Sequence, residues 1–315
     1  MLLSNSPVPS GYSVVKPLKP GFYGPTYLIR DDANSSVHVC KVLMRERMGS
    51  KEQADRLLNH IRITNTIESE YIIGYKTVNI ENEYISCVRP FIEGIGLETY
   101  IQQNLQPNHN VLFAQWKVLV RMIKYLSDKG ISPVFLKPSN IFMSAEKCFI
   151  VTDILPPPLK LNPQIHPLDP YHVGFLPPEY FVSSLSENRK SIIWSLGVIL
   201  WYFMTGSLPW NVNNAILMMK QLTKGEFSVI KLPNDIVSII NSTIKVDPNE
   251  RISFRKILKE KPGEIGTKPK LNSPILMTGL KKKCTMDIKP IIAKPKLTQI
   301  SSLVIRKRNL SPDLN

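Results

Sequence analysis

The chain has 315 residues, of which 43% are apolar and 21% are charged. This globular composition excludes wholesale disorder and collagen-like structure, and the length allows one large domain or two lobes with extensions. The 40 basic residues exceed the 25 acidic ones, which indicates nucleic acid, acidic lipid or an acidic protein as a partner. Residues 261–315 contain 12 basic and 3 acidic residues, so most of the net charge of +15 lies near the C-terminus.

Cysteine usage and apolar runs bear on the compartment. The four cysteines are widely spaced and form no C-x-x-C pair, which indicates neither a zinc site nor a redox motif and fits a reducing environment. No signal peptide is predicted. The most apolar stretch, residues 192–204, is shorter than the ~20 residues that span a bilayer. We expect an intracellular, cytoplasmic protein without a membrane span, and the basic C-terminal region leaves nuclear import open.

The first third of the chain is strand-rich. After residues 1–10, which are expected to form a flexible leader, the pattern from about residue 11 to 89 is that of strands with one helix. The helix is predicted over Ser50–Thr66, with Ser50 as its N-cap and Gln53 at the capping-box position. The predicted strands are Thr26–Arg30, Val37–Met44 and Tyr84–Val88.

Helices dominate from about residue 90 to 259. Asn110–Asp128 has one broad apolar face, whereas Ser191–Thr205 is apolar all round and should be buried. Further helices are predicted at Ala215–Gly225, Asp235–Ile244 and Ser253–Glu260. A small β-rich lobe before a larger helical lobe predicts an α+β, two-lobed fold. Residues 260–315 are basic, contain prolines and few aromatics, and are predicted to form a disordered tail.

Five motifs follow one another along the second half of the chain. They are Leu136–Met143, Val151–Asp153, Pro177–Glu179, Trp194–Leu200 and Val246–Ser253. In order and spacing they resemble the catalytic loop, the metal-binding Asp, the A-P-E motif, the central helix and the closing motif of eukaryotic protein kinases. The resemblance covers about residues 12–259 and is nearest the calmodulin-dependent and AMP-activated Ser/Thr groups. It implies the two-lobed kinase fold, with ATP and Mg²⁺ as cofactors.

The resemblance also implies roles for particular side chains. Lys41 matches the strand lysine that contacts the α/β phosphates, although it could equally be an exposed strand lysine. Asn140 and Asp153 match the two magnesium ligands, or they cap loops and form turns. Gly21 and Gly24 match two glycines of the phosphate-covering loop, or they form a plain hairpin.

Further positions match the adenine pocket and the structural frame. Arg89 falls near the gatekeeper position, where it fills the back pocket or pairs with an acid such as Glu68 or Glu70. Glu179 and Arg251 match a buried ion pair that supports the fold. The residues that match adenine-facing positions are Val39 above the ring, Phe142 at the floor, and Pro90 and Ile92 in the hinge.

Several motifs depart from the family in a chemically consistent way. Phe135 occupies the position of the catalytic Asp, and it has no lone pair to accept a proton, a contribution typically worth ~10²–10⁴ in rate. Leu155 replaces a glycine where it should resist φ > 0. His60 aligns with the helix glutamate that pairs with this lysine in the family, so Lys41 is expected to lack its positioning partner on the helix. Val134 and Ile192 also replace residues that are typical of the family.

These losses predict a catalytically impaired pseudokinase that acts as a scaffold or allosteric regulator for protein partners, and they leave open whether it binds ATP. No residue is assigned as catalytic. One alternative is an active Ser/Thr kinase with a non-standard site, because Lys41, Asn140 and Asp153 persist. A second alternative is binding of nucleic acid or acidic surfaces through residues 261–315.

Overall fold

The computed structural model describes residues 7–69, 71–103, 108–131, 136–144, 149–158, 169–182, 190–227 and 232–259. The chain separates into two units, Met1–Thr267 and Lys268–Asn315. The predicted tail lies outside the described residues, and so do Val134, Phe135 and Glu70. Within the described ranges, no helix is both long and apolar enough to cross a bilayer.

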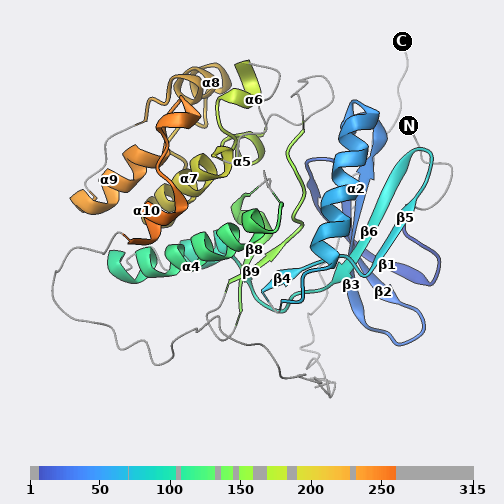
Figure 1. The fold of residues 1–315 in the computed structure, drawn as a ribbon. Helices are drawn as coiled ribbons and strands as arrows, with labels where there is room; N and C mark the ends of the chain where they lie inside the picture. The colour runs from blue at the N-terminus through green and yellow to red at the C-terminus, as the bar shows by residue number, and fades with distance from the viewer. Residues whose placement is uncertain are drawn as a thin grey trace, which may run out of the picture. The chain divides into compact units, whose positions relative to one another are not determined.

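The N-terminal lobe is an antiparallel sheet with one long helix beside it (Figure 1). The strand order is β1-β2-β3-β6-β5. Leu57 and Ile61 of α2 (Lys51–Asn65) pack in one cluster with Leu43 and Ile85 of the sheet, which holds the helix against it. The strands are β1 (Tyr12–Gly21), β2 (Gly24–Asp31), β3 (Val37–Met44), β5 (Thr77–Ile80) and β6 (Tyr84–Pro90), and a short α1 (Arg45–Met48) precedes α2.

The start of α2 confirms only half of the predicted capping box. The Ser50 hydroxyl accepts a hydrogen bond from the Gln53 backbone N–H at 3.1 Å, as an N-cap does. The Gln53 side chain, however, does not return to the cap. It is fully buried and donates to the Tyr23 hydroxyl and the Pro157 carbonyl, so tertiary contacts decide its direction.

A two-residue turn joins β1 to β2. Gly21 and Gly24 face each other in the register, so Phe22 and Tyr23 form its tip, and both are buried. Gly24 has φ +156°, and a Cβ there would lie 2.3 Å from the Val42 carbonyl oxygen. The close approach of β2 to β3 therefore requires glycine at position 24.

The predicted leader is partly packed. Val8 is buried and shares a cluster with Ile29, Cys40 and Val88. Residues 7–10 therefore belong to the fold rather than to a flexible leader, because an apolar side chain there covers the sheet.

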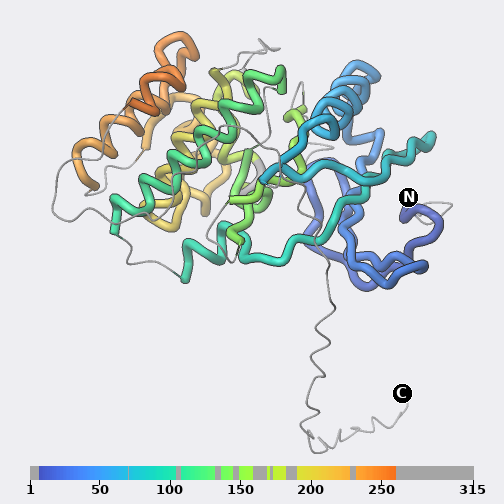
Figure 2. Tube along the Cα trace, turned by 60° about the horizontal axis from the view of Figure 1, so that its bottom comes forward, coloured from blue at the N-terminus to red at the C-terminus, as the bar shows by residue number. Residues whose placement is uncertain are grey.

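The C-terminal lobe is built around α7 (Ser191–Thr205), whose residues Ser191–Met204 are all buried. Its long neighbour α4 (His109–Asp128) lies beside it in both views (Figures 1 and 2), and the Trp116 indole donates to the Leu196 carbonyl at 2.9 Å. On the α9 (Asn234–Thr243) side, a Cβ at Gly197 would lie 2.2 Å from Thr243 Oγ1. The central helix is thus held on both sides.

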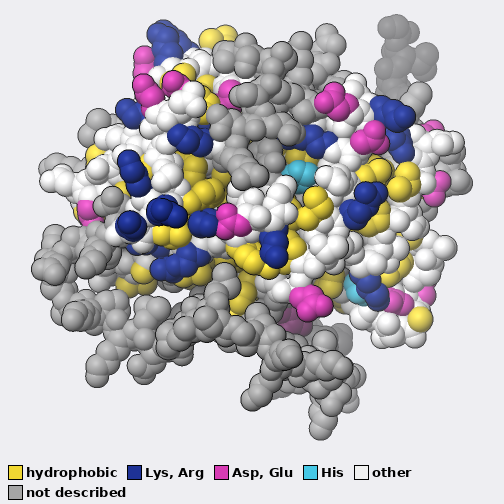
Figure 3. All heavy atoms as spheres, viewed as in Figure 1, with side chains coloured by type: hydrophobic (Ala, Val, Ile, Leu, Met, Phe, Trp, Pro, Cys, Tyr) yellow, Lys and Arg dark blue, Asp and Glu magenta, His cyan; other side chains and the backbone are white. Residues whose placement is uncertain are grey.

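The remaining elements complete the two-lobed α+β fold that was predicted. A second sheet has the order β4-β9-β8-β7 and lies where the lobes meet (Figure 1). On the face in Figure 3, Lys and Arg side chains lie over the helical lobe with fewer Asp and Glu among them. The other elements are β4 (Ile72–Ile73), β7 (Ile95–Gly96), α3 (Leu97–Gln103), β8 (Ile141–Met143), β9 (Phe149–Thr152), α5 (Pro170–Val173), α6 (Glu179–Val182), α8 (Ala215–Lys224) and α10 (Phe254–Lys259), with 3₁₀ turns at Pro138–Asn140 and Pro248–Glu250.

Candidate functional site

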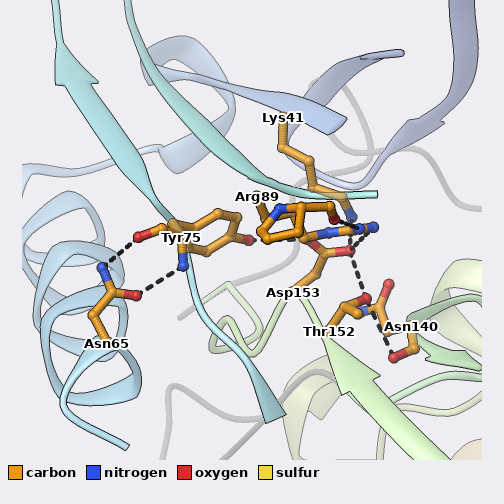
Figure 4. Close-up of polar contacts among 8 residues, drawn as sticks. Lys41, Asn65, Tyr75, Arg89, Asn140, Thr152 and Asp153 are labelled. Atoms are coloured by element: carbon orange, nitrogen blue, oxygen red, sulfur yellow. Dashed lines mark hydrogen bonds and ion pairs between the residues drawn. The ribbon is translucent and has the colours of Figure 1, made fainter. Parts of the chain in front are cut away.

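Asp153 stands at the centre of a buried polar network. It follows β9, and its side chain is 2% exposed. Lys41 reaches it from β3 and Arg89 from β6, whereas Tyr75 and Thr152 donate their hydroxyls (Figure 4). The geometry therefore brings together side chains that lie up to 112 residues apart.

Both carboxylate oxygens of Asp153 are occupied by donors. Oδ1 accepts from Arg89 Nε at 3.0 Å and from the Tyr75 hydroxyl at 3.1 Å. Oδ2 accepts from Lys41 Nζ at 2.8 Å, Arg89 Nη2 at 3.2 Å and the Thr152 hydroxyl at 3.1 Å. A carboxylate has about four lone-pair positions, so five donors leave none of them for another ligand.

The charges explain the protonation state of the network. Burial by itself would raise the pKa of Asp153, but the Arg89 and Lys41 cations outweigh it and hold that pKa well below its usual range. Burial and the facing Asp153 carboxylate raise the pKa of Tyr75 well above its ordinary value. Asp153 is thus an anion and Tyr75 a neutral donor at neutral pH.

Arg89 lines a cavity beside the network and also pairs with an acid, the two outcomes left open for it. Its acidic partner is Asp153, and not Glu68. The pairing is bidentate, through Nε and Nη2, which is the geometry that favours a guanidinium over an ammonium. Its Nη1 donates to the Pro90 carbonyl at 3.1 Å. Arg89 therefore contacts both a predicted metal ligand and a predicted adenine contact.

Lys41 has a carboxylate partner in Asp153, whereas His60 stands in the place of its expected helix partner. His60, which was aligned with that partner, is buried in α2, and its Nδ1 has no hydrogen-bond partner in the described structure. Burial, with Arg56 adding to it, lowers the pKa of His60 to about 4. His60 is therefore a neutral packing residue.

The backbone strain lies elsewhere than the sequence indicates. Leu155 was expected to resist a positive φ, yet the residue with positive φ is Asp153, at +55°. Leu155 is instead buried against Phe22 and Leu176. The five donors hold Asp153 in its left-handed conformation, which a non-glycine residue adopts at a cost of about 1–2 kcal/mol.

The predicted metal ligands do not fit Mg²⁺ in this arrangement. Asn140 is buried and lines the same cavity as Asp153, so the two residues are brought together. Mg²⁺ requires carboxylate oxygens at about 2.0–2.1 Å in a near-ideal octahedron. Those of Asp153 are taken by Lys41, Arg89 and two hydroxyls. Within the described ranges, no cluster of three or more His, Cys, Asp or Glu side chains offers another metal site.

A cavity of about 230 Å³ opens beside the network, and a smaller one of about 30 Å³ lies under the β1–β2 turn. Of the predicted nucleotide contacts, Gly21, Lys41, Val39 and Phe142 line the larger cavity and Gly24 the smaller one. Pro90 and Ile92 line neither.

Sequence reasoning missed Lys137, which lines both cavities and is buried. Burial, with the Lys41 charge adding to it, lowers the pKa of Lys137 to about 7. The signal was its place between Leu136 and Asn140 in the motif that follows α4.

The β1–β2 turn is fastened to the segment after Asp153. The Tyr23 hydroxyl donates to the Pro156 carbonyl at 2.8 Å. Gln53 Nε2 donates to the Tyr23 hydroxyl at 2.7 Å and to the Pro157 carbonyl at 3.2 Å. Arg56 Nη1 also donates to the Pro157 carbonyl, at 3.0 Å. We call these five residues the Tyr23 latch, and it closes the turn over the smaller cavity.

The Tyr23→Phe variant tests the latch. It removes the hydroxyl that serves the buried Pro156 carbonyl and Gln53, so we expect the free energy of unfolding to fall by about 1–2 kcal/mol. Urea unfolding measures this. Tyr27→Phe is the control, because the Tyr27 hydroxyl has no hydrogen-bond partner among the described residues. Equal stability of the two variants would contradict the latch.

Glu179 and Arg251 form a second buried ion pair, and neither residue lines the two cavities. Arg251 Nη1 and Nη2 donate to the two Glu179 oxygens at 2.8 and 2.7 Å. The Arg251 side chain is 0% exposed and its guanidinium lies 5.3 Å from the Trp194 ring centre. Ser191 also donates to Glu179, which ties the start of α7 to α6.

Comparison with known proteins places this geometry in context. The family described as protein kinase domain matches residues 12–261. One relative, the probable serine/threonine-protein kinase nek3 of Dictyostelium discoideum, is 25% identical over 79% of this chain. CBL-interacting serine/threonine-protein kinase 20 of Arabidopsis thaliana is 21% identical over 84%, and the ovarian-specific serine/threonine-protein kinase Lok of Drosophila melanogaster is 24% identical over 79%.

The chain spans only part of these relatives. The alignments cover 23% of nek3, 60% of the Arabidopsis kinase and 56% of Lok. The matched part corresponds to the two lobes described above.

Proposed function

Since the chain belongs to the protein kinase family, we propose that it is a pseudokinase: a kinase-like domain that acts as a scaffold or allosteric regulator in signalling, without efficient phosphoryl transfer. The observation that carries this proposal is the saturation of Asp153 by five donor groups, three of which belong to the cations Lys41 and Arg89. Phosphoryl transfer depends on positioning and charge stabilisation by bound metal, and an acid that is already neutralised contributes neither.

Two further features support the proposal. The Pro90 carbonyl, matched to the adenine contact, already accepts from Arg89. Phe135, in the position of the catalytic Asp, offers no general base. The buried Glu179–Arg251 ion pair stabilises the helical lobe. A domain that acts by binding a partner needs such a stable fold even without catalysis.

A phosphorylation assay with Mg²⁺ and ATP tests the proposal. For the full chain with a generic protein substrate, we expect turnover at least ~100-fold below the about 1–100 s⁻¹ usual for kinases. Any residual signal should be equal in the Lys41→Met variant, which loses the matched phosphate contact, and in Lys129→Met, an exposed lysine of no assigned role.

The competing function is an active Ser/Thr kinase with a rearranged site. It is favoured by the meeting of Lys41, Lys137, Asn140 and Asp153 around one cavity. Turnover in the kinase range that Lys41→Met abolishes and Lys129→Met preserves would establish it and overturn the pseudokinase proposal.

A further inference from the structure

The larger cavity combines apolar walls with an excess of positive charge. Leu18, Val39 and Phe142 supply apolar surface from the sheet and from β8. Four basic side chains and two acidic ones also line it, a net charge of +2 when all are ionised. The basic ones are Lys19, Lys41, Arg89 and Lys137, and the acidic ones are Glu98 and Asp153.

Arg89 binds the Asp153 carboxylate, which a metal-dependent pocket would keep available for the metal ion. Its guanidinium is 6% exposed and makes two hydrogen bonds to Asp153. A cation of the protein thus neutralises this acid, so a ligand need not bring a divalent metal with it. The basic side chains Lys19, Lys41 and Lys137 outnumber the remaining acid Glu98, which suits an anion such as a phosphate monoester.

The smaller cavity limits the length of the ligand. Under the Phe22–Tyr23 tip there is space of about 30 Å³, whereas one water already needs about 10–15 Å³. The Tyr23 latch holds this tip down against Pro156. A chain of three phosphates does not fit there, whereas Lys41 and Lys137, which line both cavities, present two basic side chains to the larger one.

The size of the larger cavity also favours a small ligand. Its volume of about 230 Å³ lies below the about 300–1,000 Å³ of pockets for drug-sized ligands. A ring of modest size would contact Val39 and Phe142, and a phosphate attached to it would reach the lysines.

Resting on the pseudokinase function, we propose that this cavity binds a nucleoside monophosphate, or a phosphate monoester of that kind, without a metal ion. The Arg89 guanidinium replaces the divalent metal ion as the partner of Asp153. Lys41, Lys137 and Lys19 recognise the phosphate. The Tyr23 latch is the element that selects one phosphate over three.

Equilibrium binding to the full chain, by calorimetry and thermal shift, tests the proposal with AMP as the probe. We expect AMP to bind in EDTA with an affinity that excess Mg²⁺ leaves unchanged within about 2-fold. Adenosine, which lacks the phosphate, and ATP with Mg²⁺ should each bind at least ~10-fold more weakly than AMP.

Matched lysine variants locate the site. Lys137→Gln and Lys19→Gln should each weaken AMP binding by ~10-fold or more, because a hydrogen bond to a charged group is lost. Lys129→Gln makes the same charge change at an exposed position and should leave the affinity unchanged. Lys19→Gln also serves if the buried Lys137 variant does not fold.

Three results would overturn the inference: no AMP binding, AMP binding that requires Mg²⁺, or equal affinity in Lys19→Gln and Lys129→Gln. Each of these can occur in a chain that transfers no phosphate, so the inference would fail while the pseudokinase proposal stands. Phosphoryl transfer from ATP would instead remove the proposed function.

Discussion

The Asp153→Asn variant is expected to lose about 3–5 kcal/mol of unfolding free energy, the largest effect of any single substitution in the pocket. The neutral amide would leave Lys41 and Arg89 buried and facing each other without their shared anion. Asn also cannot accept on both of its terminal atoms, so at least one of the Arg89, Tyr75 and Thr152 donors would lose its acceptor.

Urea unfolding at neutral pH measures the effect. Asp128→Asn is the control, because Asp128 is 60% exposed in its pair with Lys124 and such pairs contribute about 0–1 kcal/mol. Adding Arg89→Met to Asp153→Asn should restore part of the loss, since it removes one of the two unpaired cations. A loss below 1 kcal/mol for Asp153→Asn would contradict the buried network.

The Asp153 effect also has a defined pH dependence. The folded pKa lies below the unfolded value of about 3.9, so the stabilisation is fully present above about pH 5. It declines as the pH falls and the unfolded chain takes up a proton at this group. The difference between the native chain and Asp153→Asn should therefore be smaller at pH 3 than at pH 5.

The Arg251→Met variant should lose a similar about 3–5 kcal/mol, from the other end of the helical lobe. Glu179 would keep its charge but lose the two guanidinium hydrogen bonds that offset it. The Lys190, Lys245 and Val246 carbonyls would lose their guanidinium donor, and the Trp194 ring would lose its cation.

Thermal and urea unfolding check this prediction against Lys224→Met. Lys224 and Glu226 are 56% and 59% exposed and 3.9 Å apart, so that substitution should cost less than 1 kcal/mol. Arg251→Met within 1 kcal/mol of the native chain would show that the pair is not needed for the stability of the lobe.

Local sequence patterns predicted much of the fold. The apolar face of Asn110–Asp128 and the wholly apolar Ser191–Thr205 gave helices close to α4 and α7, because burial imposes a period on the sequence. Ser50 set the start of α2, since a hydroxyl before the first turn satisfies its backbone N–H. The two-lobed architecture followed from the order of these elements.

The sequence also partly predicts which face of the sheet a side chain occupies. Lys41 pairs with Cys87 across β3 and β6, and Val39 pairs with Arg89. Alternate residues of a strand share a face, so Lys41 and Arg89 face the same way once the register is known. The register itself comes from pairing, which is why Arg89 could be placed near the pocket but its partner could not be chosen.

The sequence by itself determined the family resemblance, the lobes and part of the pocket, including Lys41, Asn140 and Asp153. Only the tertiary structure decided what they do to one another: that Arg89 neutralises Asp153, that Asp153 carries the positive φ, and that Gln53 leaves its cap for Tyr23 and Pro157. The physical reason is competition for donors. A buried carboxylate accepts from whichever cations and hydroxyls the fold brings within about 3 Å, and these come from four separate segments of the chain.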